Sequence, residues 1–255
     1  MQKVQKIYKV INNKKLCQQF FHLCLKPVSA IPEIKPGQFI HIKVSQGLEP
    51  VFRRPFSVAR AGKNVEVIYE VVGKGTEILS QKKPGEILDV LGPLGNSFCK
   101  PPKGVKQVVM IGGGVGVAPL LALSDVLKGR GYEMVLLYGG RIKGHTFNMR
   151  TFCKNGCKVY VATEDGSVGI KGRVDKLYTK IKANAKETFI YTCGPRPMMA
   201  SVAAFARKHG VQGQVSCEEV MACGVGTCLG CAIETRSGYK TVCDDGPVFD
   251  INEIF

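Results

Sequence analysis

The sequence has no long hydrophobic run. No stretch approaches the roughly 20 consecutive apolar residues that a membrane-spanning helix needs, although 45% of the 255 residues are hydrophobic. The first residues, Met-Gln-Lys-Val-Gln-Lys, contain no apolar core of the kind that a secretory signal peptide requires. The sequence therefore predicts a protein with no membrane span and a cytoplasmic location.

The sequence also lacks a block of basic residues, although Lys and Arg outnumber Asp and Glu by 36 to 20 and give a formal net charge of +16. The lysines are scattered along the chain, and neither a zinc-finger nor a helix-turn-helix pattern occurs. We therefore expect no binding to nucleic acid. A diffuse positive field would equally favour dinucleotide phosphates or an acidic partner protein.

The cysteines do not form the even set that a disulfide framework needs. Their number is 11, and an odd count without an export signal favours metal ligation or free thiols in a reducing compartment. The cysteines of the first 200 residues are mostly scattered. Five others lie close together near the end of the chain: Cys217, Cys223, Cys228, Cys231 and Cys243.

The chain divides into three parts by its hydrophobic pattern. Residues 1–101 contain short segments rich in Val and Ile between turns, which predicts an antiparallel β-barrel. Residues 102–212 alternate apolar strands with helices, which predicts a doubly wound parallel-sheet α/β domain. Residues 213–255 are rich in Gly and Cys and can bury little core, so we expect a small subdomain that a metal centre holds together.

The two larger parts allow individual elements to be predicted. In the first part we expect strands at Gln38–Val44, Phe56–Ala59, Val65–Val72 and Ile87–Leu91. In the second part we expect strands at Gln107–Ile111, Met134–Tyr138, Lys158–Ala162 and Thr188–Tyr191, and helices at Ala118–Lys128, Val174–Ala183 and Pro197–Lys208.

The last cysteines have the spacing of a metal centre. Cys223, Cys228, Cys231 and Cys243 follow the pattern C-x4-C-x2-C-x11-C, and C-x4-C-x2-C…C is the plant-type [2Fe–2S] spacing. Zinc is the rival, but structural zinc usually takes two close cysteine pairs, and only one occurs here. The spacing therefore favours a [2Fe–2S] cluster over zinc or free thiols, and it leaves Cys217 as a buried or incidental thiol.

Glycines inside the cysteine motif agree with this prediction. Gly224, Gly226 and Gly230 lie between the first three cysteines. They allow backbone conformations that side chains would forbid, so the loop can wrap a cluster with its N–H groups aimed at the sulfurs. Hydrogen bonds of that kind help to set the reduction potential of the cluster.

Two further motifs lie where an α/β sheet binds ligands. Gly112, Gly113, Gly114 and Gly116 stand between a predicted strand and helix, where backbone amides and the helix dipole favour a phosphate. A Rossmann fingerprint also includes an acidic residue about 20 residues after the glycines. In this sequence the next predicted strand is followed by Arg141 instead. Arg141 could contact the adenosine side of a dinucleotide, which leaves NADH and NADPH both open.

The second of these motifs is Cys193-Gly194-Pro195, which follows another predicted strand at the carboxyl edge of the sheet. Ligands bind at this edge in open α/β sheets. We assign Cys193 no role as a nucleophile.

Taken together, the motifs carry a family resemblance. The segments Arg54-Pro55-Phe56-Ser57, Gly112–Pro119 and Cys193-Gly194-Pro195 resemble the ferredoxin–NADP reductase superfamily. With the cysteine motif appended, the chain more closely resembles the electron-transfer subunits of class 1B dihydroorotate dehydrogenases, and Leu91–Asn96 and Val242–Phe249 share this likeness. The similarity extends over essentially the whole chain.

The resemblance implies positions for FAD and for the nicotinamide dinucleotide. Arg54 and Ser57 would contact the flavin, with Pro55 and Phe56 shaping their strand; Ile68, Tyr69 and Glu70 would lie along FAD; Gly75 and Thr76 would hold its pyrophosphate. The glycine loop and the Cys193–Pro195 segment would bind NAD(H). No acid–base catalytic residue is implied, because the cofactors carry the chemistry.

The resemblance also implies a function. The chain would be the NAD-linked reductase subunit of an oxidoreductase, passing electrons between NAD(H), FAD and the [2Fe–2S] cluster. A separate FMN-containing subunit, in a heterotetramer of two copies of each, would oxidise dihydroorotate to orotate in pyrimidine biosynthesis. The alternatives are a reductase subunit of a bifurcating or sulfide-reducing complex, and a zinc-holding interaction module that is not an enzyme.

Overall fold

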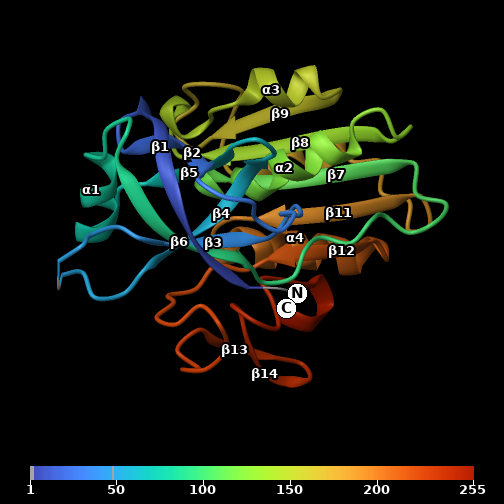
Figure 1. The fold of residues 1–255 in the computed structure, drawn as a ribbon. Coiled ribbons are helices and arrows are strands. Elements are labelled where there is room, and N and C mark those ends of the chain that lie inside the picture. Colours follow the sequence, from blue (N-terminus) through green and yellow to red (C-terminus); the bar gives the residue numbers. More distant parts are fainter. Residues whose placement is uncertain (1–2, 48) are drawn as a thin grey trace.

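The computed structural model describes residues 3–47 and 49–255 (Figure 1). Met1 and Gln2 begin the segment in which the sequence predicts no signal peptide, and they lie outside the described part. Within that part, no helix combines the length and the apolar character needed to cross a bilayer.

The N-terminal part is the predicted antiparallel barrel. Its strands are β1 (Val4–Cys17), β2 (Phe20–Pro27), β3 (Phe39–Lys43), β4 (Arg54–Ala61), β5 (Val65–Glu70) and β6 (Ile87–Leu94), and a short helix α1 (Lys74–Ser80) follows β5. The barrel closes in the order β1-β2-β5-β4-β3-β6. Alternate residues such as Ile40 and Ile42 of β3 point into its core, as a period of two residues in a strand requires.

The outer face of β3 is buried as well. Phe39 belongs to a different apolar cluster from Ile40 and Ile42, one that contains residues of the C-terminal part. One short strand therefore joins two cores, the interior of the barrel on one side and the cysteine-rich part on the other.

The second part is the predicted α/β domain. Its sheet contains β7 (Gln107–Gly113), β8 (Glu133–Gly140), β9 (Cys157–Thr163), β10 (Ile170–Lys171), β11 (Thr188–Cys193), β12 (Gln212–Ser216) and β15 (Val248–Asp250). The strand order is β10-β9-β8-β7-β11-β12-β15. Every neighbouring pair is parallel except β12 with β15.

Helices α2 (Val117–Leu127), α3 (Met149–Lys154) and α4 (Arg196–His209) and 3₁₀ turns η1 (Gly114–Gly116) and η2 (Lys143–His145) connect these strands. The predicted helices near Ala118–Lys128 and Pro197–Lys208 correspond to α2 and α4. The parallel order and its crossover helices confirm the doubly wound fold class.

One predicted helix is wrong in type and length. The segment expected as a helix over Val174–Ala183 is a 3₁₀ helix, η3 (Val174–Lys180). Side chains three residues apart eclipse each other in a 3₁₀ helix. Val174 and Leu177 have that spacing and are both buried against the sheet, so the tighter helix suits this short crossover.

The C-terminal part contains little regular structure. It forms a hairpin of β13 (Ala232–Thr235) and β14 (Gly238–Thr241), the strand β15 and the short helix α5 (Ile251–Ile254). The hairpin lies at the edge of the molecule, below the barrel and the sheet in Figure 1. Because β12 and β15 both extend the large sheet, the division of the chain at residues 101 and 212 remains a prediction.

Polar contacts join the three parts, and two side chains of the barrel make several of them. Arg60 of β4 donates two hydrogen bonds to Asp125 of α2, at 2.8 and 3.0 Å, and so links the barrel to the α/β domain. Asn96, just after β6, donates to the carbonyl oxygens of Asp245 and Val248 at 2.9 and 2.8 Å and accepts from the Val248 N–H at 2.9 Å. The barrel thus holds both of the other parts.

We predict that Asn96→Ala lowers the free energy of unfolding by about 1–2 kcal/mol. Each hydrogen bond contributes about 1 kcal/mol net, and the total is reduced because part of this site is open to water. Urea unfolding followed by circular dichroism measures the change. Asn12, an exposed residue of β1, supplies the control Asn12→Ala. Equal stabilities of the two variants would contradict the anchoring role of Asn96.

Candidate functional site

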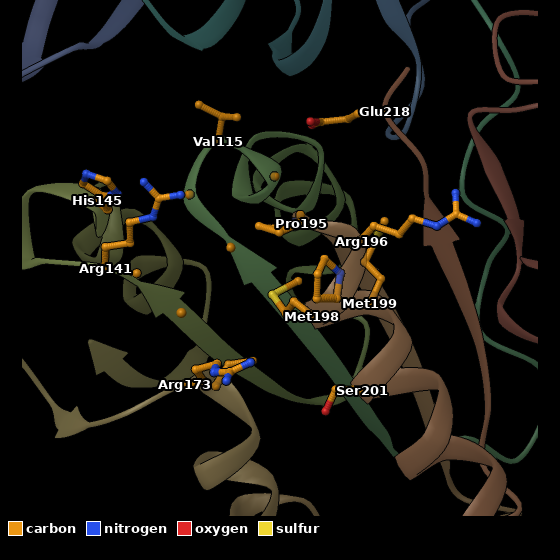
Figure 2. Close-up of a pocket in the computed structure, with 18 of the residues that line it drawn as sticks. Val115, Arg141, His145, Arg173, Pro195, Arg196, Met198, Met199, Ser201 and Glu218 are labelled. Carbon is orange, nitrogen blue, oxygen red and sulfur yellow. The ribbon is translucent and has the colours of Figure 1, made fainter. Parts of the chain in front are cut away.

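A cleft of about 700 Å³ opens between the barrel and the carboxyl edge of the parallel sheet. Phe20 and Glu70 line it from the barrel, and the glycine loop and the Gly194-Pro195 turn line it from the sheet. Figure 2 shows Glu218 and Val115 at the end nearest the barrel and Arg173 and Ser201 at the opposite end. The cleft is long enough to bring one end of a ligand to the barrel and the other to the α/β domain.

The two motifs predicted to bind the dinucleotide touch each other here. A Cβ atom on Gly116 would lie 2.6 Å from the carbonyl carbon of Cys193 and 2.7 Å from the Cα of Gly194. The glycine loop follows β7 and the turn follows β11, and the strand order departs in opposite directions from this adjacent pair. Such a switch point is where open α/β sheets bind ligands.

Cys193 is fully buried at the end of β11. Burial raises the pKa of its thiol well above the ordinary value, and the nearby Glu218 carboxylate adds to the effect. The thiol stays neutral, and its Sγ donates to Glu218 Oε1 at 3.9 Å. A neutral buried thiol is a poor nucleophile.

Glu218 was missed by the sequence analysis. Loss of solvation raises the pKa of its carboxyl, the hydrogen bond from Cys193 lowers it, and the Glu70 carboxylate adds a smaller rise. The only sequence signal is its position two residues after β12, at the same carboxyl edge as the other motifs. The Glu218 carboxyl group therefore borders the barrel end of the cleft.

Arginines line the rest of the cleft. Arg141, which the sequence placed on the adenosine side, is joined by Arg173 and Arg196, which it did not identify. Figure 2 shows the side chain of Arg141 extending from the edge of β8 toward the glycine loop. Guanidinium groups pair well with phosphates, so this lining suits a ligand that carries several phosphates.

Two of the three predicted flavin segments, Arg54–Ser57 and Gly75-Thr76, also come together. The side chain of Arg54 lies across Gly75, where a Cβ atom would be 2.6 Å from Arg54 Nε. Thr76 closes the adjacent turn by accepting the N–H of Val72 at 3.0 Å and that of Gly73 at 3.3 Å. Residues more than 20 positions apart thus form one small surface on the outside of the barrel.

The remaining predicted flavin residues divide between two faces. Phe56 and Tyr69 are buried in the barrel core, with ring centroids 5.6 Å apart, and the Tyr69 hydroxyl donates to Asn13 at 3.0 Å. Ser57 and Pro55 are half-buried. Ile68 packs toward the α/β domain, and Glu70 faces the cleft. Only the backbone of Phe56 and Tyr69 is therefore free to meet a ligand outside the barrel.

The four predicted metal ligands are brought together in the C-terminal part. Backbone N–H groups point at their sulfurs: Gly226 donates to Cys243 Sγ at 3.1 Å, and Val225 donates to Cys223 Sγ at 3.4 Å. Cys228 is exposed, whereas Cys231 and Cys243 are buried. The loop has the sulfur-directed amides that the glycine pattern predicted.

The thiols are arranged as two pairs. Cys223 lies beside Cys228, and Cys231 lies beside Cys243. Among the described residues, no three His, Cys, Asp or Glu side chains converge on a point that could hold a single metal ion. Two thiolates for each of two bridged irons is the donor set of an all-cysteine [2Fe–2S] cluster, so the residues fit that group.

The backbone of the loop also favours thiolates. Burial opposes ionisation of Cys223, but hydrogen bonds from the N–H groups of Val225 and Cys228 outweigh it and lower its pKa to about 6. Cys217 packs in the same apolar cluster as Cys231 and Cys243, and burial raises its pKa to about 12. The electrostatic environment thus differs between Cys217 and Cys223, the first ligand of the spacing pattern.

A buried histidine beneath the loop was also missed. His41 of β3 is fully buried, and burial, with the nearby Arg53 charge, lowers its pKa to about 4. One His in a strand otherwise rich in apolar residues gives no sequence signal for this position.

Comparison with known protein families gives two matches. Residues 218–255 match the iron-sulfur cluster binding domain of dihydroorotate dehydrogenase B. Residues 110–204 match an oxidoreductase NAD-binding domain. The first match contains all four paired cysteines, and the second contains the glycine loop and the Cys193 turn.

Curated relatives resemble the chain over almost its full length. The chain is 36% identical over 255 residues to the electron transfer subunit of dihydroorotate dehydrogenase B (NAD(+)) from Geobacillus thermodenitrificans, covering 96% of both chains. The protein of the same name from Bacillus caldolyticus is 40% identical over 229 residues, covering 86% of both.

Solved structures show the same architecture. An NADH-dependent reduced ferredoxin–NADP oxidoreductase, studied for flavin-based electron bifurcation, is 30% identical with a TM-score of 0.85, over 97% of this chain and 89% of the other. A ferredoxin–NADP+ reductase from Neisseria gonorrhoeae has a TM-score of 0.69 over 81% of this chain and 92% of the other. At 18% identity, the latter shows the fold alone.

We predict that Gly116→Ala weakens NADH binding at least tenfold, because the new methyl group would push the glycine loop away from the Cys193 turn. Fluorescence titration of the purified protein measures the dissociation constant. Gly62→Ala is the matched control, since nothing lies within 4 Å of a Cβ atom there. An unchanged affinity in Gly116→Ala would show that this contact does not shape the dinucleotide site.

Proposed function

Because the chain belongs to the family of electron transfer subunits of dihydroorotate dehydrogenase B, we propose that it carries electrons between NAD(H) and a separate catalytic subunit. That subunit would oxidise dihydroorotate to orotate in pyrimidine biosynthesis. The observation that supports this most is the packing of the four-cysteine loop against β3, whose neighbour β4 begins with the Arg54–Ser57 motif.

Three groups of residues would hold the cofactors. Arg54, Ser57, Gly75 and Thr76, with the β5 segment Ile68–Glu70, would hold FAD on the outside of the barrel. The glycine loop and the Cys193–Pro195 turn would hold NAD(H). The paired cysteines would ligate the [2Fe–2S] cluster. When bound, FAD and the cluster supply the conversion of two-electron hydride transfer into single-electron transfer.

The chain's own contribution is to bind and orient. The amides of the glycine loop and the arginines of the cleft would fix the dinucleotide phosphates, which leaves the nicotinamide to reach the barrel end. There the neutral Cys193 thiol and the Glu218 carboxyl border the reacting position without competing as nucleophiles. NAD(H) is the dinucleotide that the names of the relatives support.

The partner would dock where the cysteine loop reaches the surface. Val220 and Leu229 are apolar side chains with 85% and 65% of their surface exposed, and they flank the loop that carries the exposed Cys228. Exposed apolar side chains next to a functional group favour a protein interface. We propose an FMN-containing partner in a heterotetramer of two copies of each subunit, working in the cytoplasm, where all eleven thiols would stay free.

The alternatives have less support. The bifurcating reductase shares the fold, but its 30% identity is below the 36–40% of the dihydroorotate dehydrogenase relatives. A zinc-holding module would require ligands that converge on one ion, and the paired thiols do not favour that arrangement.

We predict that Cys228→Ala loses the cluster but retains FAD, because the flavin residues all lie in the barrel and α1. Electron paramagnetic resonance of the dithionite-reduced protein measures the cluster, and absorbance after heat release measures FAD. The control Cys217→Ser should keep the resonance signal. A full cluster signal in Cys228→Ala, or its loss in Cys217→Ser, would contradict the ligand assignment.

We also predict that Val220→Asp weakens binding to the catalytic subunit at least tenfold, since a charge would have to be buried at the interface. Analytical ultracentrifugation of the mixed subunits measures the affinity. Val28→Asp is the control, because Val28 is 66% exposed at the end of β2 in the barrel. The docking face is wrong if both variants bind the partner equally well.

A further inference from the structure

His41 lies between the predicted flavin motif and the cysteine loop. It is the central residue of β3, and it pairs with Pro55 of β4 on one side and with Leu91 of β6 on the other. Since neighbours along a strand point to opposite faces, His41 shares the outer face of β3 with Phe39, which packs into the C-terminal core. The imidazole is therefore directed away from the barrel interior.

The polar atoms of this side chain are poorly paired, with only the backbone groups of Arg53 and Cys223 within reach of the ring. The residue is 0% exposed, and neither Nδ1 nor Nε2 has a hydrogen-bond partner of acceptable geometry. Buried polar atoms are nearly always hydrogen-bonded, and an exception calls for an explanation such as a redox role or a group bound in the functional state. A Leu here would fill similar space without leaving unpaired nitrogens.

The imidazole contacts the cysteine loop at one defined point. A Cβ atom on Gly224 would lie 2.5 Å from His41 Nδ1 and 3.1 Å from Cε1. Gly224 also has a φ of +72°, a conformation that side chains rarely adopt. The ring thus lies against the backbone immediately after the first cluster ligand, Cys223.

We propose that His41 is a positioning residue for the cluster: its imidazole supports the Cys223–Gly224 turn, and its N–H donates a hydrogen bond to that turn once the loop has closed around the metal centre. This inference rests on the proposed function, because it assumes that the paired cysteines carry a [2Fe–2S] cluster.

The position of His41 gives it two effects. Because β3 is hydrogen-bonded to the strand that carries Arg54–Ser57, the imidazole fixes the cysteine loop relative to the flavin motif. Hydrogen bonds to ligating residues also raise the reduction potential of an iron–sulfur centre by stabilising its more negative, reduced form.

The test is to compare His41→Leu and His41→Gln in the purified protein. We expect His41→Leu to retain FAD and to lower the ratio of reduced to oxidised cluster at least tenfold at the wild-type midpoint potential. A tenfold change in this ratio corresponds to a fall of about 59 mV in the midpoint potential of a one-electron couple. His41→Gln keeps an N–H donor and should recover part of this shift. A redox titration followed by electron paramagnetic resonance measures the ratio.

His22→Leu is the matched control. His22 lies on β2, where it pairs with Glu66 at 2.8 Å, and its loss should leave the cluster potential unchanged. Loss of iron from His41→Leu with full retention of FAD also supports the proposal. Equal potentials and iron contents in His41→Leu and His22→Leu overturn it.

A second variant covers the case in which His41→Leu loses both FAD and iron. Gly224→Ala disturbs the same contact from the loop side and leaves the barrel strand intact. It should lower the cluster potential or the iron content with FAD retained, and wild-type values for both would overturn the proposal. If the wild-type protein itself contained no iron or acid-labile sulfide, the proposed function would fail instead.

Discussion

The packing of the cysteine-rich segment onto the outer face of β3 is the constraint on which the rest of the molecule depends. That segment has too few apolar residues for a core of its own, so Cys231 and Cys243 share one with Phe39 and Leu94 of the barrel. A core that is shared in this way fixes the distance between the two parts. Electron transfer between a flavin and a metal centre needs such a fixed distance, and the fold supplies it without a separate linker.

A second fixed arrangement involves β4, the strand next to β3. Helix α2 packs against β4 and is held by the ion pair of Arg60 with Asp125, which also accepts a hydrogen bond from Asn155 at 2.6 Å. The glycine loop leads into this helix, so its position relative to β4 is set by the same contact. The cleft and the cysteine loop are therefore both positioned relative to the β3–β4 pair.

The parts of this arrangement that sequence could predict are those with a local signature. Strand and helix periods gave the barrel and the α/β domain, and the spacing from Cys223 to Cys243 gave four thiols that the fold does bring together. What sequence could not predict depends on tertiary contacts. The orientation of Tyr69 into the barrel, the position of Glu218 at the cleft and the contact of His41 with Gly224 all follow from which face of a strand meets which neighbour. The 3₁₀ helix at Val174–Lys180 was missed because its residues also suit an α-helix until the sheet beneath them is known.

Electron transfer from NADH through FAD to the cluster is tested most directly by an anaerobic titration of the purified protein with NADH, followed by optical absorbance and by electron paramagnetic resonance. We expect NADH to bleach the flavin and then to produce the resonance signal of a reduced [2Fe–2S] cluster in the same molecules. Bleaching of the flavin with no cluster signal, in protein shown to contain iron and acid-labile sulfide, would contradict the proposed path from the cleft to the cysteine loop.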